Sequence, residues 1–396
     1  MIDFLAQAVY PLDTSPAGLY VHVPFCRSRC TYCGFVSTVH DPDIEEIYVD
    51  AVIKEITLVQ GERAWGMLHR GITIDSLYFG GGTPSVLSLE SLSRLLKSCL
   101  SSFRLAQPVE ITIEVNPATG SEEIFGAWLA LGVNRVSLGV QSLDDRVLRH
   151  MGRSHTAEEA LAAFRLLRSV GFENISVDIM AGFPGQSRTS LLRTTEDLLT
   201  LQPEHLSVYL LEVKPGTALE QRLQRGETLA AADDATAEMY EDVCRLAEAA
   251  GYEQYEIANF ARKDKYSRHN LKYWTDRRYV GVGPGACGMT GRQRYTNVPD
   301  IEDYCSALAG SRLPRETVEE LSAAVRFRDA LIMGLRLVRG IDLKELSTRY
   351  GVDAAGYVNE TIGDLEAAGL FEINGDRLAL TSRGRLLSNT IFCRWV

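Results

Sequence analysis

One stretch near the start of the chain decides the fold: Leu19-Tyr-Val-His-Val-Pro-Phe-Cys26-Arg-Ser-Arg-Cys30-Thr-Tyr-Cys33. Its first five residues have strand character, and three cysteines then fall within eight residues. The chain has eight cysteines in all, and the other five are scattered: Cys99, Cys244, Cys287, Cys305 and Cys393. A cluster with scattered single cysteines predicts one metal site and mostly buried thiols, and we expect Cys393 to be one of the buried ones.

Strands and amphipathic segments alternate after this stretch. Five further runs have strand character: Ile74–Phe79, Val109–Val115, Arg135–Gly139, Ile175–Met180 and Leu206–Leu211. Segments with apolar residues at three- and four-residue spacing lie between them, including Ile44–Leu58, Leu89–Leu100, Glu122–Leu131 and Ala157–Val170. Such alternation predicts an α/β protein of parallel βα units, arranged as an open doubly wound sheet or a barrel-like curl.

Each predicted strand runs directly into unusual residues. The second is followed by Gly80-Gly-Gly-Thr-Pro84, the third by Asn116-Pro117 and the fifth by Gly182-Phe-Pro-Gly185. Because the carboxyl ends of parallel strands lie together, we expect these loops to form one rim and to hold the active site. Four polar residues lie at or just beyond strand ends on that rim: Glu114, Gln141, Arg153 and Asp178.

The composition is that of an ordinary globular chain. Of 396 residues, 45% are hydrophobic and 23% are charged, which excludes wholesale disorder and a coiled coil. The net charge of −11 argues against nucleic-acid binding, because a protein that binds nucleic acid usually presents a basic face to the phosphates. No run of about 18 apolar residues occurs, and the first residues lack a signal-peptide pattern. We therefore expect no integral membrane segment and a cytoplasmic location.

The pattern changes after residue 217. A helical stretch near Ala231–Ala250 leads to the polar, aromatic segment Tyr252–Arg278 and a glycine loop. From about residue 316 the pattern is three helices and a hairpin at Asn374-Gly375, as in a winged helix. Residues 316–396 hold 10 Lys and Arg against 12 Asp and Glu, a net charge of −2, which disfavours DNA binding. We predict a barrel or sheet core over residues 15–215, an α/β extension over 216–315 and a winged-helix-like domain over 316–396.

The three clustered cysteines can hold a compact soft-metal centre. A closed zinc site needs a fourth ligand nearby, and residues 34–37 supply none. Three thiolates on one loop instead suit a [4Fe-4S] cluster with one iron left open. Zinc completed by a histidine or a distant thiol stays open as an alternative, as does an incidental spacing.

The Cys-x3-Cys-x2-Cys spacing after a first strand, with Tyr32 before the last cysteine, resembles the radical S-adenosylmethionine superfamily. The resemblance implies a partial (β/α)6 TIM-like barrel and a [4Fe-4S] cluster held by Cys26, Cys30 and Cys33. It also implies that the amino and carboxylate groups of S-adenosylmethionine occupy the open iron. The Gly80–Pro84 run resembles the strand end that holds the methionyl amino group, and on its own it is equally a tight strand-to-helix turn.

Longer motifs narrow the resemblance to the oxygen-independent coproporphyrinogen III oxidase-like family. They are Tyr20-Val-His-Val-Pro-Phe-Cys26, Gly80–Pro84, Glu114-Val-Asn-Pro117, Gly139-Val-Gln-Ser142 and Gly182-Phe-Pro-Gly185. The match runs through most of the chain, including the C-terminal helices. It implies that S-adenosylmethionine contacts fall on nine positions: Tyr20, Tyr32, Gly81, Gly82, Thr83, Glu114, Gln141, Arg153 and Asp178.

The branches of this family have different tasks. The oxidases that decarboxylate coproporphyrinogen carry a further cysteine where this chain has Phe35, and a longer arm before the cluster. Both departures count against an oxidase. Methyltransferases or cyclopropanases of the same ancestry stay open, with a porphyrinogen or aromatic small molecule as substrate.

The segment His269-Asn-Leu-Lys-Tyr273-Trp274, followed by a glycine loop, is similar to a heme-chaperone branch. In a helix His269 and Tyr273 share a face, an imidazole is a natural axial ligand of heme iron, and aromatic rings stack on a porphyrin. On spacing alone, a packed aromatic segment is the alternative. Two departures are visible: Cys287 stands where these relatives have histidine, and Gly34 where many have aspartate.

The resemblance thus implies a protein that binds heme and transfers it to acceptor proteins. Its cofactors would be the cluster, S-adenosylmethionine and heme, with heme at His269, Tyr273, Trp274 and Cys287. An electron donor such as flavodoxin or ferredoxin would be a further partner. Whether the protein is also an enzyme, either an oxidoreductase or a methyltransferase of the radical type, stays open, and no catalytic residue is assigned beyond the cluster.

Overall fold

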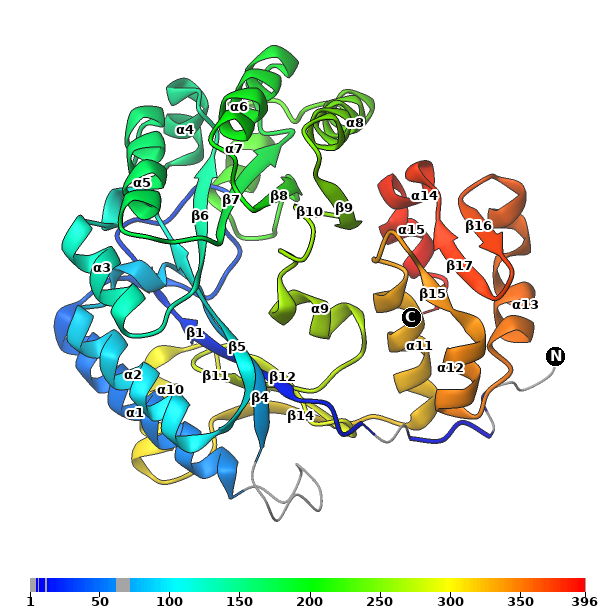
Figure 1. Cartoon of the computed structure of the whole chain (residues 1–396), viewed down its shortest axis with the longest axis horizontal. Coiled ribbons are helices and arrows are strands. Elements are labelled where there is room, and N and C mark those ends of the chain that lie inside the picture. The colour runs from blue at the N-terminus through cyan, green and yellow to red at the C-terminus, as the bar shows by residue number, and fades with distance from the viewer. Residues whose placement is uncertain (1–4, 6, 11–12, 62–71, 396) are drawn as a thin grey trace.

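The computed structural model describes residues 5, 7–10, 13–61 and 72–395. A large curved sheet forms its centre (Figure 1). Six parallel strands lie side by side in chain order: β1 (Ala17–Val23), β4 (Thr73–Gly81), β5 (Arg104–Val115), β6 (Arg135–Gln141), β7 (Ile175–Ala181) and β8 (His205–Leu210). All six predicted strands are confirmed, and the sheet curls as a partial barrel rather than lying open.

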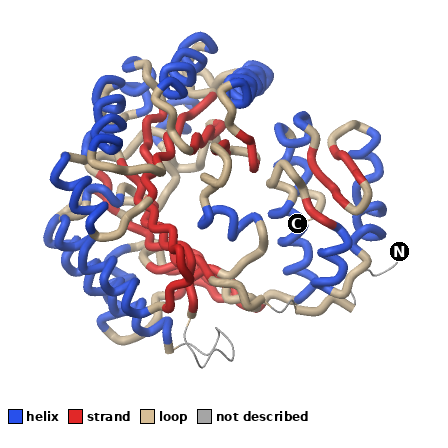
Figure 2. The backbone as a smooth tube through the Cα atoms, in the orientation of Figure 1, coloured by secondary structure: helices blue, strands red, loops and turns tan. Residues whose placement is uncertain are grey.

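Helices cover the outer face of the curl (Figure 2). The predicted helices agree with the observed ones to within two residues at each end. Thr156 begins one of them with a capping box, in which it and Glu159 bond each other's backbone amides. The helices of this part are α1 (Pro42–Gln60), α2 (Leu89–Ser102), α3 (Glu122–Ala130), α4 (Asp145–Met151), α5 (Ala157–Ser169), α6 (Arg188–Thr200), α7 (Ala218–Gln224) and α8 (Asp233–Ala249).

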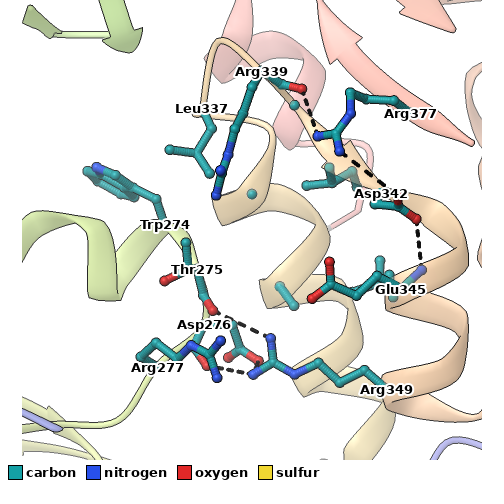
Figure 3. Close-up of a pocket in the computed structure, with 15 residues that line it drawn as sticks. Trp274, Thr275, Asp276, Arg277, Leu337, Arg339, Asp342, Glu345, Arg349 and Arg377 are labelled. Atoms are coloured by element: carbon teal, nitrogen blue, oxygen red, sulfur yellow. Dashed lines mark hydrogen bonds and ion pairs between the residues drawn. The ribbon is translucent and has the colours of Figure 1, made fainter. Parts of the chain in front are cut away.

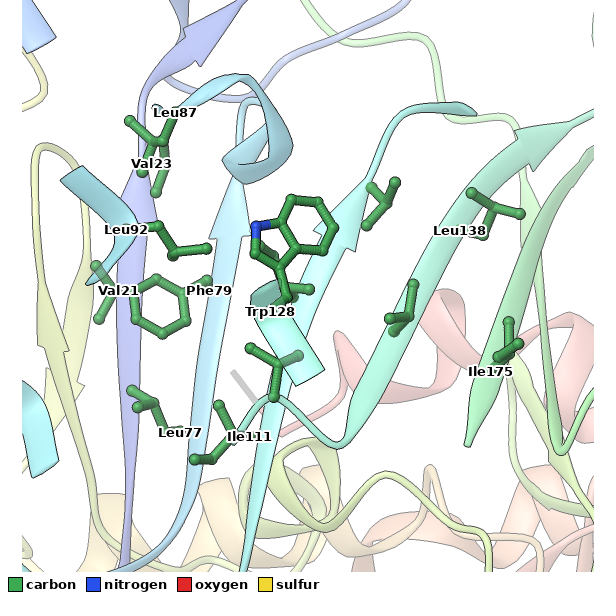
Figure 4. Close-up of a cluster of buried hydrophobic side chains, with 14 of the residues drawn as sticks. Val21, Val23, Leu77, Phe79, Leu87, Leu92, Ile111, Trp128, Leu138 and Ile175 are labelled. Atoms are coloured by element: carbon green, nitrogen blue, oxygen red, sulfur yellow. The ribbon is translucent and has the colours of Figure 1, made fainter. Parts of the chain in front are cut away.

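The two faces of the strands differ in chemistry because side chains alternate along a strand. On the helix-covered face Val21, Phe79 and Ile111 pack with Trp128 of α3 in one buried apolar cluster (Figure 4). On the inner face many of the alternate positions are aromatic, charged or hydroxyl-bearing, as with Ser76 and Tyr78 on either side of Leu77. The inside of the barrel is therefore polar, and the apolar core lies between the sheet and its helices.

Residues 253–320 extend the same sheet to twelve strands. On one edge β11 (Tyr279–Val282) runs parallel to β1, followed by antiparallel β12 (Cys287–Met289), β13 (Gln293–Asn297) and β14 (Arg315–Glu320). On the other edge β10 (Asn259–Ala261) and β9 (Glu253–Glu256) add to β8. Helix α9 (Arg268–Trp274) lies inside the curve, and α10 (Ile301–Ala309) packs against α1 (Figure 1). The predicted boundary at 315–316 falls within β14.

The C-terminal part has its own apolar cluster, which includes Phe327, Leu331 and Leu378. The three predicted helices and the hairpin at Asn374-Gly375 are confirmed, whereas the predicted burial of Cys393 is wrong because this cysteine is exposed. Among the described residues, no helix combines the length and apolar character that a bilayer crossing needs. The elements are α11 (Ala323–Gly334), β15 (Ile341–Asp342), α12 (Leu343–Tyr350), α13 (Ala354–Ala367), β16 (Phe371–Asn374), β17 (Arg377–Leu380), α14 (Ser382–Leu386) and α15 (Ser388–Phe392).

Candidate functional site

The cysteine loop follows β1 and is fastened to the rim by backbone hydrogen bonds. Two short parallel strands, β2 (Phe25–Cys26) and β3 (Thr38–Val39), close the loop at its base. The amide of Thr31 donates to the carbonyl of Met151 at 2.9 Å, and the carbonyl of Thr31 accepts from Leu219 at 2.8 Å. The loop is therefore held by α4 and by the start of α7 as well as by its own strands.

The three cysteines of the loop are half-buried, and none of them forms a disulfide. Two of them accept hydrogen bonds: Thr83 Oγ1 lies 3.4 Å from Cys26 Sγ, and Arg153 Nη1 lies 3.6 Å from Cys30 Sγ. Burial raises the pKa of Cys26 and of Cys33. A bound metal centre reverses such a shift, because its positive charge favours the thiolate.

The three cysteines match the number of protein ligands that a [4Fe-4S] cluster with one open iron takes. In the described part of the chain, no three His, Cys, Asp or Glu side chains are grouped so that they could hold one metal ion. A mononuclear zinc site requires that its thiolates converge to about 2.3 Å from one point. A [4Fe-4S] cluster instead takes one thiolate at each of three separate iron corners, and Cys26, Cys30 and Cys33 supply that number.

The glycine run lies beside the loop and is tied to Glu114. Gly81 has φ of +114°, and a Cβ there would lie 2.6 Å from the ring of His22, so only glycine fits. Its amide donates to Glu114 Oε2 at 3.1 Å, while Tyr78 Oη donates to Oε1 at 2.9 Å. Burial raises the pKa of Glu114 to about 7.

Gln141 and Arg153 lie next to each other at the end of β6. Gln141 has φ of +64°, and the pairing of β6 with β7 shifts register at this point. Such a conformation in a residue other than glycine is uncommon and often marks a functional position. Arg153 Nη2 donates to the carbonyl of Gly139 at 2.7 Å, and its buried Nε has no hydrogen-bond partner within the described residues.

The remaining residues of the predicted S-adenosylmethionine set lie deeper or at the side. Asp178 is buried and accepts from Ser137 at 2.9 Å, and burial raises its pKa. Tyr20 bonds His22 Nδ1 at 3.1 Å and stacks on Tyr78, with ring centroids 6.1 Å apart. Tyr32 packs edge-on against a phenylalanine at the rim. The structure thus gathers the predicted residues along one wall, from the cysteine loop into the barrel.

His269 lies inside the barrel with both ring nitrogens occupied. Its side chain is 1% exposed; Nδ1 bonds Ser76 Oγ at 3.1 Å and Nε2 bonds Tyr273 Oη at 2.9 Å. Burial lowers the pKa of His269 to about 3, so the ring is neutral. The prediction that His269 and Tyr273 share a helix face is confirmed, and the histidine is already hydrogen bonded on both sides.

Trp274 and Cys287 are more exposed than the buried His269. Trp274 lines a cavity that faces the C-terminal part, with the guanidinium of Arg336 4.4 Å from its ring centroid. Cys287 is exposed on β12, where its sulfur lies 3.4 Å from Thr296 Oγ1. Burial raises the pKa of Tyr273, and the nearby Cys287 adds to this shift, so Cys287 lies close to Tyr273 although it is exposed and His269 is buried.

Several polar residues of the barrel interior were not among the site residues predicted from the sequence. Besides Tyr78 and Ser76, they include Glu110, whose carboxylate accepts from the first two amides of α9 at 3.1 and 3.2 Å. Arg135 is 1% exposed, and two of its nitrogens have no hydrogen-bond partner among the described residues. The signal was present in the alternation of the strands, since polar residues at every second position of a buried strand indicate a polar interior.

Comparison with known proteins agrees with this arrangement. The model of the radical SAM superfamily matches residues 20–198, and that of the HemN C-terminal domain matches residues 321–387. Heme chaperone HemW of Mycobacterium tuberculosis is 36% identical over 381 residues, which cover 96% of this chain and 95% of the relative. Heme chaperone HemW of Bacillus subtilis is 33% identical, covering 94% and 97%.

A solved structure shares the fold of nearly the whole chain. Coproporphyrinogen III oxidase (HemN) from Escherichia coli, a radical SAM enzyme, matches with a TM-score of 0.83 at 24% identity, covering 99% of this chain and 92% of that one. The predicted α/β fold class is thereby confirmed. Whole-length similarity above 30% identity to the curated relatives decides the family. The chain belongs to the radical S-adenosylmethionine superfamily and, within its coproporphyrinogen III oxidase-like family, to the HemW group.

Proposed function

We propose that this protein is a cytoplasmic heme chaperone that binds heme and passes it to acceptor proteins. The observation that carries the proposal is the similarity to proteins named heme chaperone HemW over at least 94% of both chains. Membership of the radical SAM superfamily implies a [4Fe-4S] cluster and S-adenosylmethionine as cofactors. Cys26, Cys30 and Cys33 would hold the cluster, and a flavodoxin or ferredoxin would supply electrons.

The wall beside the cysteine loop offers matched partners for S-adenosylmethionine. Glu114 and the backbone at Gly81, Gly82 and Thr83 would bind its amino group, and Arg153 its carboxylate. Gln141 and Asp178 would accept from the ribose hydroxyls, while Tyr20 and Tyr32 would pack against the ligand. When bound, the cluster and S-adenosylmethionine supply one-electron chemistry. The residues of this chain orient them and exclude water.

Heme binding by His269 requires a rearrangement of its contacts. Its Nε2 must leave Tyr273 Oη before it can ligate iron, and the low pKa helps, because a neutral imidazole is the ligating form. Trp274 would contact the macrocycle, and the exposed Cys287 would be the alternative protein ligand of the iron. We propose His269 as the principal ligand and Tyr273 as the residue that holds it until heme arrives.

The test is a hemin titration of the anaerobically reconstituted protein, followed by transfer to apomyoglobin. We expect a Soret band that His269→Ala weakens at least tenfold in affinity, with Asn270→Ala on the same helix as the control. Transfer should then appear as the spectrum of holomyoglobin. Absence of any hemin-induced band would contradict the chaperone function.

The same samples test the radical-enzyme alternative. Formation of 5′-deoxyadenosine or S-adenosylhomocysteine with conversion of coproporphyrinogen, together with a hemin spectrum unchanged in His269→Ala, would favour an oxidase or methyltransferase. Conversely, heme transfer without either product would favour the chaperone.

A further inference from the structure

A cavity of about 330 Å³ lies between the end of α9 and the C-terminal part, in the size range of small-molecule pockets (Figure 3). Trp274 and Thr275 form one side, and residues of α11, β15 and α12 form the other. Part of the lining is apolar: Trp274, Leu337, Ile341 and Leu346. Trp274, the last residue of the proposed heme segment, thus lines a cavity that the buried His269 itself does not line.

Four arginines line this cavity, although the chain as a whole is acidic. Two of them are already paired: Arg349 with Asp276 at 2.9 Å and Arg277 with Asp13 at 3.2 Å. Arg339 is different, because within the described residues its guanidinium has no hydrogen bond or ion pair. Arg377 lies 3.9 Å from Asp342 and donates to the backbone carbonyl of Arg339 at 3.3 Å.

A tight turn brings Arg339 and Arg377 to the same side of this cavity. Gly340 has φ of +64°, and a Cβ there would lie 2.0 Å from the carbonyl of Leu378, so the turn after α11 packs directly on β17. Arg339 precedes this glycine, and Arg377 begins β17. Figure 3 shows Arg339 running down beside Leu337 toward Trp274, with Arg377 on the Asp342 side.

Resting on the proposed function, we propose that this cavity binds the carboxylate edge of the porphyrin. The two propionates pair with Arg339 and Arg377, and the adjoining edge of the macrocycle contacts Trp274 and Leu337. A guanidinium fork matches a carboxylate in two hydrogen bonds, and the indole of Trp274 offers a flat apolar surface on the ring face opposite Arg336. Arg339 is free to make such a pair without breaking an existing one.

Glu345 provides a second test, in which a substitution is expected to strengthen ligand binding rather than weaken it. Its carboxylate lines the same cavity, and no hydrogen bond or ion pair engages it within the described part of the chain. A negative charge at this position repels a bound propionate. Its removal is therefore expected to strengthen the binding of a dianionic ligand and to leave a neutral one unaffected.

The experiment compares hemin with hemin dimethyl ester, whose carboxylates are masked. Soret titrations of the full-length reconstituted protein measure both affinities. The wild type should bind the ester about a hundredfold more weakly, because the ester loses both propionate–arginine pairs and each pair is expected to contribute about tenfold, or about 1.4 kcal/mol. Arg339→Gln and Arg377→Gln should each weaken hemin binding about tenfold and leave ester binding unchanged, whereas Glu345→Gln should strengthen hemin binding only.

Arg394→Gln is the matched control, since Arg394 is an exposed arginine of the same part that pairs with Asp364 and does not line the cavity. It should leave both affinities unchanged. Equal wild-type affinity for hemin and its ester, or equal loss of both ligands in the arginine variants, overturns the proposal while the chaperone function stands. Failure of the wild type to bind either ligand defeats both. Ester binding by each variant shows that it is folded.

Discussion

Tyr78 on β4 donates a hydrogen bond to Glu114 on the neighbouring strand β5, with 2.9 Å between Oη and Oε1. The other carboxylate oxygen accepts from the amide of Gly81. These two bonds favour the ionised form of Glu114, while burial favours the protonated form. Burial outweighs them, because the pKa rises from 4.5 to about 7. Glu114 therefore changes charge near neutral pH.

We expect the affinity for S-adenosylmethionine to increase as the pH rises from 6 to 8. The amino group of the ligand donates N–H bonds to this carboxylate, an ionised carboxylate is the stronger acceptor, and Glu114 loses its proton around pH 7. Calorimetric titration at pH 6, 7 and 8 measures the effect, and Glu114→Gln should bind weakly at all three. Tyr78→Phe removes a donor to the carboxylate and should move the rise to higher pH. An affinity that does not depend on pH in the wild type would contradict the role of Glu114.

Arg153 is expected to raise the reduction potential of the cluster. Its Nη1 lies 3.6 Å from Cys30 Sγ, and a positive charge at a cluster sulfur stabilises the added electron. Arg153→Gln should lower the potential by on the order of 60 mV, the one-electron equivalent of about 1.4 kcal/mol. A redox titration followed by electron paramagnetic resonance measures it. Arg146→Gln, which changes an 80% exposed arginine, should leave the potential unchanged.

His269 should make the protein sensitive to acid. Its pKa is about 3 in the folded state and about 6.5 when exposed, so the unfolded chain gains a proton first as the pH falls. This contribution to stability is present above pH 6.5 and is lost progressively between pH 6.5 and 3. At pH 5 the loss amounts to about 2 kcal/mol.

Urea unfolding of the apoprotein at pH 7.5 and 5 measures this dependence. His269→Gln should show a smaller loss between the two pH values, while His150→Gln, at an exposed position, should behave like the wild type. The same pH dependence in His269→Gln as in the wild type would contradict the prediction.

Asp276 should be essential for the attachment of the C-terminal part. It follows α9 and accepts from Arg326, Arg349 and Tyr350, and the side chain of Arg326 is only 2% exposed. Asp276→Asn removes the ion-pair partner of this buried arginine, which typically costs about 3–5 kcal/mol. Urea unfolding measures the loss. Asp364→Asn, which breaks an exposed ion pair with Arg394, should cost about 1 kcal/mol or less.

Local patterns were enough to place most of the elements. Strand β1 and helix α5 follow from short runs whose side-chain period is two or 3.6 residues, and such periods are properties of neighbouring residues. The same applies to the hairpin at Asn374-Gly375 and to the shared face of His269 and Tyr273. The cysteine loop was recognisable because its three ligands lie within eight residues.

These local patterns do not predict which strands pair when they are far apart in the sequence. Strand β11 runs beside β1 although about 260 residues separate them, and β9 and β10 extend the opposite edge of the same sheet. The segment His269–Trp274 looked like one binding motif, yet its histidine points into the barrel and its tryptophan into the cavity. The pairing of Glu114 with Tyr78 likewise depends on the register between two strands.

The amino-acid order by itself determined the six βα units, the thiolate loop and the glycine run beside it, because each arises from interactions among residues close along the chain. Only the folded chain decided which polar side chains share the barrel interior, how burial moves the pKa of Glu114 and His269, and that Arg339 and Trp274 line the same cavity. Those outcomes depend on the curvature of the sheet and on desolvation, which combine contributions from distant segments.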